Sequence, residues 1–536
     1  MGINFHFRKP ELMSQLTWRV LAIYMFVSFG SFNFGFDLAW WSSCLGLQQF
    51  ADDYGVSDGP GQKKYIPSNW QSAGTGTPNA GMAIGCIFGG FCCQYLGRKM
   101  TIVVLAIVSI VGVVIQCAVP SYWGVLVGRT INGISMGMES NVIPTYSAEL
   151  APPAIRGSLV NFYQWWQIVG NIVTASFIYG TSIHLKGQWQ YKPVMITQVF
   201  VPVVLLTGVW FMPESPRWLL MKNRRADAER ALASIRKGLS GPEEVAAELA
   251  LTESALQEQM ELAAHITYLD CFKGSNLRRT LIAVIIQIMQ QIQGNSFMNN
   301  YLVVFLQRIG IKNSLQIYIA ENATQLGGIT LAFYFTDKIG RRPILIVSAF
   351  FMGALMWIVA GLGAYTNVQG SSAQGCVAAI LIYQAIAGGC WGSCTWITTS
   401  EAAAAAVREK TIMTATFMSF CMVLIITYVN PYVQNEGYGN LGARVGFVYG
   451  GCSFLALLWT FFFLPELKGR SLEELDEMFT ARVPTRKFKD YVCSGLGAEL
   501  TKLQASGYEG TIEIKAKDAV DGLDEDVVST DAEKRV

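Results

Sequence analysis

The chain of 536 residues is 52% apolar and only 15% charged, and its mean hydropathy is +0.34, whereas a soluble domain has about 25% charged residues. The 40 basic and 38 acidic residues leave a net charge of +2, so no global field recruits nucleic acid. Composition also excludes a disordered chain and a small disulfide-linked domain, because the 12 cysteines stand mostly inside apolar runs, as small buried residues do.

Apolar runs long enough to cross a bilayer recur along the chain. A membrane-spanning helix needs about 20 predominantly apolar residues, and we predict twelve such helices. Basic residues flank the runs on one side of the membrane, for example Arg19 before the first run and Arg278 and Arg279 before the seventh. The positive-inside rule then places both termini in the cytoplasm. The predicted spans are 20–41, 77–97, 100–119, 121–146, 158–183, 193–212, 280–306, 315–336, 343–365, 376–400, 411–433 and 445–465.

Polar segments divide the chain into five parts. A cytoplasmic N-terminus at 1–19 precedes a six-helix bundle at 20–212. The linker at 213–279 is rich in Ala, Glu, Arg and Leu, so we predict short amphipathic cytoplasmic helices there. A second six-helix bundle covers 280–465, and 466–536 form a cytoplasmic tail that becomes polar toward its end.

The two bundles carry the same pattern of charges. Each has a Glu followed seven residues later by an Arg, and a Pro-Glu pair whose Pro lies 57 residues after that Arg. A parallel repeat of this kind predicts two six-helix halves with a substrate cavity between them near the bilayer midplane. The repeated residues are Gly97, Arg98, Lys99, Glu149, Arg156, Pro213 and Glu214 in the first half, and Gly340, Arg341, Arg342, Glu401, Arg408, Pro465 and Glu466 in the second.

Several motifs resemble the sugar porter branch of the major facilitator superfamily, and the run at 294–311 looks most like fungal sugar transporters of the lactose-permease-like group. The resemblance covers about 20–480. It implies an all-α membrane protein with twelve transmembrane helices in two pseudo-symmetric six-helix bundles, short cytoplasmic helices between the halves, and a place in the plasma membrane. The motifs are GGFCCQYLGRK (89–99), GRT (128–130), PTYSAELAPPAIRG (144–157), PESPRWL (213–219), QQIQGN (290–295), DKIGRR (337–342) and PELKGRSLEEL (465–475).

Charged residues at the predicted cytoplasmic helix ends are candidates for a gating network. Ordinary positive-inside flanking would explain the arginines, but it does not explain glutamates at matched positions beside them. Ion pairs between helix ends can hold the inner face shut until they rearrange. The first half has Gln94 and Tyr95 where the family usually has Asp or Asn and Arg, so we expect its network to be weaker. The network comprises Arg98, Glu149, Arg156, Glu214, Arg217, Asp337, Arg341, Glu401, Arg408 and Glu466.

Asp37 is the candidate proton site, because a carboxylate about 17 residues into the first span is costly to bury. Its predicted partner is Arg129, the only cation in span four. Displacement of the arginine would let the carboxylate take up a proton. The alternative is a structural ion pair that joins spans one and four. The resemblance favours the proton site, because proton-coupled sugar porters carry an Asp in the setting that Gly35, Phe36 and Asp37 match here.

Amides and aromatic side chains are the candidate sugar ligands, since amides pair with hydroxyls and aromatic rings stack on the apolar faces of the ring. Hydrogen bonds between helices are the alternative role for each amide. The resemblance implies that Gln164, Gln290, Gln291 and Trp396 contact sugar. The sequence departs from the family pattern at Ser296, Ser393, Ser419 and Phe420. The full candidate set is Gln164, Asn171, Gln290, Gln291, Asn295, Asn300 and Trp396.

We therefore expect a proton-coupled sugar importer that works by alternating access, as a monomer in the lipid bilayer. The alternatives are a facilitative sugar uniporter and a non-transporting sugar receptor on the same fold. An enzyme is not expected, since the sequence shows no nucleotide-binding loop, no metal-ligand spacing and no Ser-His-Asp arrangement. We expect no cofactor and no metal, and the proton is the coupling ion. The sugar itself stays open between hexose, pentose, disaccharide and sugar acid.

Overall fold

The computed structural model contains long helices and no β-strand within the residues it describes, where Val56 and Tyr65 form an isolated antiparallel bridge. Helices dominate because the apolar runs must satisfy their backbone hydrogen bonds internally in lipid. The structure describes residues 18–57, 59, 62–150, 156–237, 241–243, 245–246, 248–250, 252–253, 256, 267–311, 313–364, 370–404, 407–435, 438–468, 470, 472–488, 490–491 and 493.

The first half makes six helical crossings within the described residues. The second and third crossings, α4 and α5, follow each other almost without a loop. Gly97 between them adopts a φ of +89°, a conformation that favours glycine. The crossings are α2 (Trp18–Leu45), α4 (Ser68–Leu96), α5 (Arg98–Ala118), α6 (Tyr122–Leu150), α7 (Arg156–His184), and a sixth made of α8 (Lys192–Thr197), α9 (Phe200–Gly208) and η3 (Val209–Phe211).

The second half makes six more crossings in the described part of the chain, and two of them contain a π-helical segment. Gly340, with a φ of +103°, separates α15 from α16 as Gly97 separates α4 from α5. The crossings are α13 (Gly274–Gln290) with η5 (Gln291–Asn295) and α14 (Ser296–Arg308), α15 (Ser314–Ile339), α16 (Arg341–Ala364), α17 (Ser371–Ile386) with η6 (Ala387–Gly392) and α18 (Ser393–Ala402), α19 (Arg408–Gln434), and η8 (Gly442–Arg444) with α20 (Val445–Phe463).

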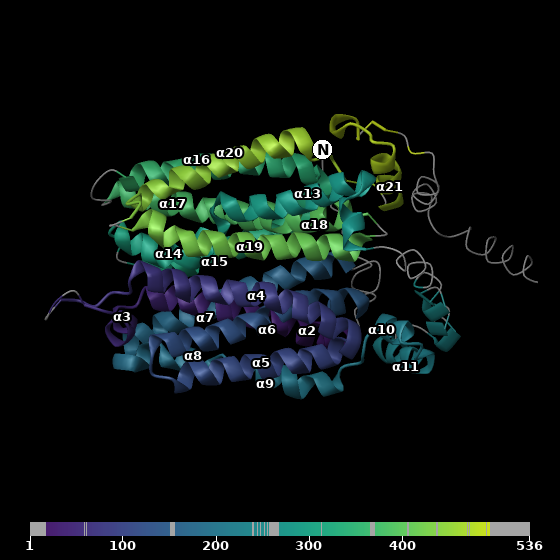
Figure 1. Ribbon diagram of the computed structural model, residues 1–536, viewed down its shortest axis with the longest axis horizontal. Coiled ribbons are helices and arrows are strands. Elements are labelled where there is room, and N and C mark those ends of the chain that lie inside the picture. The colour runs from purple at the N-terminus through teal and green to yellow at the C-terminus, as the bar shows by residue number, and fades with distance from the viewer. Residues whose placement is uncertain are drawn as a thin grey trace, which may run out of the picture.

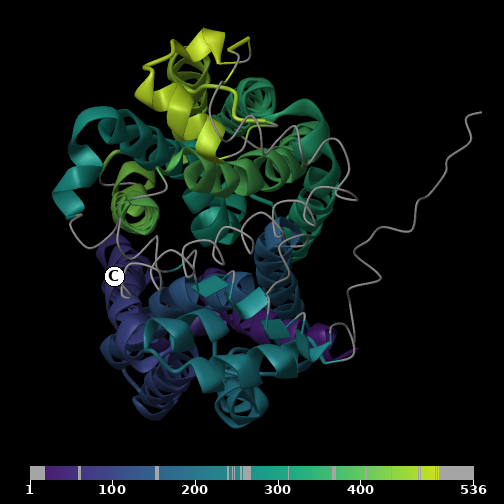
Figure 2. The same ribbon diagram turned by 90° about the vertical axis from the view of Figure 1, so that its right-hand side faces the viewer.

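The two halves lie side by side with their helices roughly parallel to the long axis (Figures 1 and 2). They meet where α4 packs on α19, α7 on α15, and α2 on α14. Short elements gather at the two ends of the molecule. One end, here called the loop end and predicted to be extracellular, carries α3 (Gln48–Tyr54) and η2 (Gly187–Gln190). The opposite end, here called the linker end and predicted to be cytoplasmic, carries α10 (Pro216–Met221), α11 (Arg225–Ile235), η4 (Tyr268–Phe272), α21 (Leu472–Thr480) and η9 (Thr485–Lys487).

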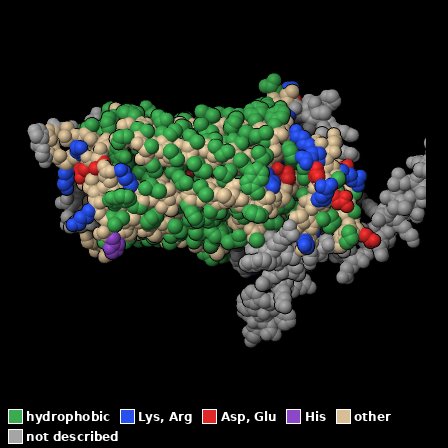
Figure 3. All heavy atoms as spheres, turned by 90° about the horizontal axis from the view of Figure 1, so that it is seen from below, with side chains coloured by type: hydrophobic (Ala, Val, Ile, Leu, Met, Phe, Trp, Pro, Cys, Tyr) green, Lys and Arg blue, Asp and Glu red, His purple; other side chains and the backbone are tan. Residues whose placement is uncertain are grey.

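Hydrophobic side chains cover the middle of the molecule and charged side chains gather at both ends (Figure 3). Large apolar side chains such as Phe88, Val114 and Ile358 are exposed on this belt, as expected for a surface in contact with lipid. The more polar crossings, such as α4 and α7, carry amides and hydroxyls toward the centre. Among the described residues, six helices are long and apolar enough to cross a membrane: Arg98–Ala118, Lys192–Phe211, Arg341–Ala364, Ser371–Ala402, Arg408–Gln434 and Gly442–Phe463.

The first half is tightly packed because glycines let backbones approach. A Cβ atom on Gly85 of α4 would lie 2.0 Å from the carbonyl oxygen of Ile134, and one on Gly137 of α6 would lie 2.1 Å from that of Met82. Neither position has room for a side chain, so α4 and α6 touch through their backbones. This contact holds the polar residues of α6 in a defined position relative to α2 and α4.

The π-helical segments interrupt the seventh and tenth crossings at the level of the polar side chains. Gly294 in η5 has a φ of +111°, which breaks the helical backbone there. η6 ends directly before Ser393, one of the positions where the sequence departs from the family pattern. Such segments often occur at functional sites, since they free backbone groups and redirect side chains.

Candidate functional site

A cavity of about 190 Å³ lies between the two halves. Its walls come from α2, α4, α6 and α7 of the first half and from α13, η5, α14, α18 and α19 of the second. The side chains that line it include none from Asp, Glu, Lys, Arg or His among the described residues. Six of the seven predicted substrate-binding residues line this cavity: Gln164, Gln290, Gln291, Asn295, Asn300 and Trp396.

Gln291 is held in place by two serines. Its amide oxygen accepts a hydrogen bond from Ser296 Oγ at 2.8 Å, and its amide nitrogen donates to Ser419 Oγ at 3.1 Å. Both serines line the cavity, and both stand where the sequence departs from the family pattern. Both departures therefore lie in the cavity wall, where they orient the amide of Gln291.

Asn171 lies beside the main cavity and lines a smaller one of about 70 Å³, together with Gln164, Gln290 and Asn295. Its amide nitrogen donates to Asn322 Oδ1 of α15 at 3.1 Å, so it joins the two halves. Spacing of seven residues places Asn171 on the same helix face as Gln164, but about 10 Å further along the axis.

The structure adds cavity residues that were not among the predicted ligands. Gln167 follows Gln164 by three residues and lines both cavities, which the helical spacing could have indicated. Asn299 of α14 also lines both. Asn79 of α4 lines the main cavity and donates to Thr427 Oγ1 of α19 at 3.1 Å; nothing in the sequence distinguished it from the other polar residues of its helix.

Asp37 is 2% exposed in α2 and is surrounded by amides. Asn33, one turn earlier, donates to Asp37 Oδ2 at 3.2 Å, and the side chain of Asn132 of α6 also lies near the carboxylate. The amide nitrogen of Gln198 faces Asp37 Oδ1 at 3.2 Å, while its amide oxygen faces Trp40 Nε1 at 3.2 Å. These neutral donors stabilise the carboxylate without neutralising it.

Arg129 lies near Asp37, as predicted, but its side chain stacks on two tryptophans. The guanidinium carbon lies 4.2 Å from the ring centroid of Trp41 and 4.9 Å from that of Trp40. Among the described residues the structure gives no salt bridge between Arg129 and Asp37. The cation therefore acts on the carboxylate through space and is held by aromatic faces, which stabilise a desolvated cation.

Two further buried carboxyl groups were not singled out from the sequence. Glu139 of α6 and Glu321 of α15 are both 0% exposed. Glu139 accepts from Asn33 at 3.5 Å and Glu321 accepts from Asn322 at 2.9 Å. Their position inside predicted apolar spans is the signal by which the sequence could have indicated them.

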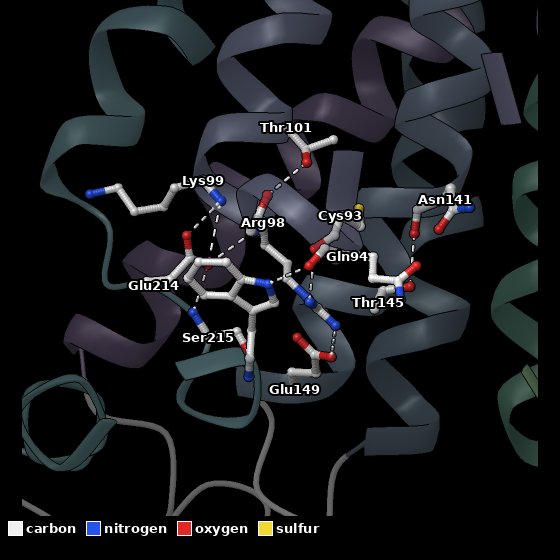
Figure 4. Close-up of polar contacts among 12 residues, drawn as sticks. Cys93, Gln94, Arg98, Lys99, Thr101, Asn141, Thr145, Glu149, Glu214 and Ser215 are labelled. Atoms are coloured by element: carbon white, nitrogen blue, oxygen red, sulfur yellow. Dashed lines mark hydrogen bonds and ion pairs between the residues drawn. The ribbon is translucent and has the colours of Figure 1, made fainter. Parts of the chain in front are cut away.

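The first charge cluster, formed by Arg98, Glu149 and Glu214, lies at the linker end (Figure 4). Arg98 Nη2 pairs with Glu149 Oε1 at 2.6 Å and Nη1 donates to the Cys93 carbonyl at 3.1 Å. Glu214 accepts from the backbone N–H groups of Arg98 and Lys99 at 3.0 and 3.2 Å, at the positive N-terminal end of α5. Burial raises the pKa of Glu214, against the opposing effect of these N–H groups.

The second charge cluster, formed by Arg341, Glu401 and Glu466, repeats these contacts. Arg341 Nη2 pairs with Glu401 Oε1 at 2.9 Å and Nη1 donates to the Thr336 carbonyl at 3.3 Å. Glu466 accepts from the backbone N–H groups of Arg341 and Arg342, both at 3.1 Å, at the start of α16. The charge repeat in the sequence therefore corresponds to a repeat in geometry.

The other predicted network residues also belong to the linker end. Arg156 begins α7 and Arg408 begins α19, while Arg217 lies in α10 and Asp337 near the end of α15. The side chains of Arg156 and Asp337 lie outside the described residues. The first cluster was expected to be the weaker one because of Gln94 and Tyr95, and this stays a prediction.

Among the described residues, hydrogen bonds join the halves at the loop end as well as beside the cavities. Gln307 of α14 donates to the Gly46 carbonyl at 2.6 Å, Asn435 bonds Ser68, and Gln316 of α15 bonds Tyr179 of α7. The Arg–Glu pairs of the two charge clusters, in contrast, each join helices of one half. The contacts between the halves thus close the loop end in this conformation.

Comparison with known proteins gives the family. The family model described as "Sugar (and other) transporter" matches residues 23–479. A major facilitator-type transporter, ecdD, of Aspergillus rugulosus is 29% identical, over 89% of this chain and 90% of that protein. A high-affinity glucose transporter of Kluyveromyces lactis is 28% identical, over 86% and 85%. The high glucose sensor RGT2 of Saccharomyces cerevisiae is 28% identical, over 85% of this chain and 60% of that protein.

Solved structures give the fold. The major facilitator superfamily proton:xylose symporter XylE, bound to 6-bromo-6-deoxy-D-glucose, superposes with a TM-score of 0.70. It is 22% identical and the match covers 86% of this chain and 99% of that one. The predicted family and the predicted fold, two six-helix bundles of the major facilitator type, are confirmed by these matches.

Proposed function

Because the chain belongs to the Sugar (and other) transporter family, we propose that it imports a neutral sugar across the plasma membrane together with a proton, by alternating access. The observation that carries this proposal is the cavity between the halves, which is lined by amides, hydroxyls and aromatic rings. The family is one of transporters and not a class of enzymes. We propose that the protein acts as a monomer in the lipid bilayer and needs no cofactor and no metal.

The cavity favours a neutral sugar over the sugar acid that the sequence left open. Amides on facing walls, such as Gln164 of α7 and Gln290 of α13, offer donors and acceptors to hydroxyls on both faces of a ring. Trp396 and Tyr163 supply aromatic surface for its apolar faces. A carboxylate would need a cation in this wall, and none of the described lining residues provides one.

Proton coupling rests on Asp37 and Arg129. A carboxylate buried at this depth is costly, and functional in most membrane proteins that carry one. Neutralising Asp37 removes its attraction for Arg129, while the contacts of the arginine with Trp40 and Trp41 remain. Because these tryptophans and Asp37 all lie on α2, the proton changes how strongly α2 holds α6. A proton can therefore favour one arrangement of the helices over another.

Alternating access rests on the contrast between the two ends. The hydrogen bonds at the loop end must break for the cavity to open toward the predicted extracellular side. The two charge clusters would then rearrange as the linker end closes. Sugar bound by both halves favours the state in which the walls are closest, and proton and sugar together drive the cycle.

Uptake of a radiolabelled panel in a transporter-null yeast cell tests this proposal. The panel contains D-glucose, D-xylose, lactose, maltose and D-glucuronate. We expect uptake of at least one neutral sugar, faster at acidic external pH, and no uptake of glucuronate. Uptake of glucuronate alone would contradict the neutral cavity, and a neutral uptake without pH dependence would instead indicate a uniporter.

A sensor is the second candidate, because one relative is named a high glucose sensor. In that case purified protein would bind a neutral sugar of the panel, whereas vesicles containing it would neither accumulate nor exchange that sugar. Exchange by reconstituted protein therefore separates a transporter from a sensor.

A further inference from the structure

Glu139 shares a hydrogen-bond donor with Asp37. The Asn33 amide nitrogen lies 3.2 Å from Asp37 Oδ2 and 3.5 Å from Glu139 Oε2. The other oxygen, Glu139 Oε1, has no hydrogen-bond partner among the described residues and packs against Gly30 of α2. A Cβ on Gly30 would lie 3.0 Å from this oxygen, so α2 presents a glycine where Glu139 needs space. Two buried carboxyl groups thus share one amide donor.

The surroundings of Asp37 and Glu139 contain more acidic groups than basic ones. Facing this stretch of α6 among the described residues are Asp37 from α2, Cys86 from α4 and Tyr163 from α7, whereas α5 presents Ser109. Arg129 lies ten residues before Glu139, about 15 Å along the axis of α6. The cation is therefore level with Asp37 and remote from Glu139. Two buried anions beside one cation are unfavourable, so one carboxyl of the pair holds a proton.

Glu139 also lies close to the cavity. Its neighbour in sequence, Ser140, and its neighbour in space, Tyr163, both line the main cavity. Because α6 runs toward the linker end, Glu139 is further from the loop end than Arg129. A proton that leaves Asp37 in the direction of the linker end therefore passes Glu139.

We propose that Glu139 is a second proton-binding group of the coupling site, which accepts the proton from Asp37 and releases it to water in the cavity. In this step an O–H bond to the Asp37 carboxyl breaks and an O–H bond to the Glu139 carboxyl forms. Negative charge moves from Glu139 to Asp37, where Arg129 stabilises it, and Asn33 donates to whichever carboxylate is anionic. This role rests on the proton-coupled transport proposed above.

Infrared difference spectroscopy of the purified protein, titrated with acid and base, tests the site without any sugar. We expect Glu139→Gln to remove a carboxyl C=O band whose intensity changes with pH, and to alter the pH at which the Asp37 band, identified by Asp37→Asn, appears. Glu139→Gln could instead remove a band that does not respond to pH and leave the Asp37 band unchanged. Glu139 would then be a permanently protonated structural residue, and the proposal would be overturned.

Glu321→Gln is the matched control. Glu321 is also fully buried and also accepts one amide hydrogen bond, from Asn322, but among the described residues it shares this donor with no other carboxyl group. Its replacement should leave the pH-dependent carboxyl bands as in wild type. If the same pH-dependent band disappeared from the spectrum of Glu321→Gln, the band would not belong to Glu139, and the proposal would be overturned.

Transport by reconstituted protein separates this proposal from the proposed function. With a radiolabelled neutral sugar of the panel, D-glucose or D-xylose, Glu139→Gln should lose accumulation driven by a proton gradient and keep equilibrium exchange. Wild-type accumulation in Glu139→Gln would refute the role of Glu139 and leave proton coupling intact. Absence of proton-driven accumulation from wild type itself would refute the coupling, and the infrared titration would then decide whether the carboxyl pair still exchanges protons.

Discussion

The two halves of this protein are alike at the linker end and unlike at their centres. The charge clusters around Arg98 and Arg341 share their salt bridge, their helix N-terminal glutamate and their separating glycine. At the centre, the first half has Asp37, Glu139 and Arg129, whereas the second half supplies most of the cavity amides. The repeated part is suited to a movement that both halves make together, and the unique parts are suited to the chemistry of proton and sugar.

The largest effect should follow from Asp37→Asn, which removes one of the central ionisable groups of the first half. Asparagine keeps the shape and accepts the hydrogen bond from Asn33 but cannot exchange a proton. Uphill accumulation and the pH dependence of uptake should both be lost, while exchange of sugar between two sides at equal concentration survives.

Uptake into proteoliposomes with an imposed proton gradient measures the accumulation of sugar. Asp52→Asn on α3, at the loop end, is the control. The side chain of Asp52 is exposed, and the one interaction that the structure gives for it among the described residues is a hydrogen bond from Gln48. An Asp37→Asn protein that still concentrates sugar would refute the assignment.

The second prediction compares the two charge clusters. In the first, Arg98 and Glu149 have side-chain exposures of 10% and 9%, while in the second Arg341 and Glu401 have 12% and 23%. Removing one partner of a buried pair costs about 3–5 kcal/mol, and solvent reduces the cost for a more exposed pair. Glu149→Gln should therefore slow turnover more than Glu401→Gln, and neither should much change sugar affinity, because both lie at the linker end.

Rates of exchange and direct binding to the purified variants check this order. Equal turnover for the two variants would mean that exposure does not determine the strength of the clusters. A large loss of affinity with normal turnover would contradict a gating role altogether.

The third prediction concerns the cavity amides. Gln164→Ala, Gln290→Ala and Gln291→Ala should each weaken sugar binding by about 2- to 13-fold, because a lost neutral hydrogen bond costs roughly 0.5–1.5 kcal/mol. Asn171→Ala should behave differently. It breaks the bond to Asn322 that joins α7 to α15, so it should change the rate of exchange more than affinity. Calorimetry on purified protein, with deoxy-sugar analogues, distinguishes the two kinds of residue; four identical losses of affinity would place Asn171 among the direct ligands.

Repetition and helical spacing made much of this architecture predictable. The charge pattern predicted both clusters, because short loops bring the residues at neighbouring helix ends together. The predicted amides of the seventh span line the cavity, as expected. The surroundings of Asp37 were not predictable, because Asn132 and Gln198 reach it from other helices, whose rotation depends on packing. The contact of α4 with α6 through glycines sets that rotation, and no local pattern reveals which residues of α6 it turns toward α2.

The smallest effect should follow from Ser419→Ala on α19. Ser419 accepts a hydrogen bond from Gln291 and thereby orients its amide, while Ser296 holds the amide oxygen. With one of two restraints removed, Gln291 stays in the cavity but loses its defined orientation, so affinity should fall by roughly 2-fold, as for a hydrogen bond at the weak end of the range. The effect should vanish in a Gln291→Ala background, because residues that act through one another are not additive. An additive double variant, measured by the same calorimetry, would mean that Ser419 contacts the sugar itself.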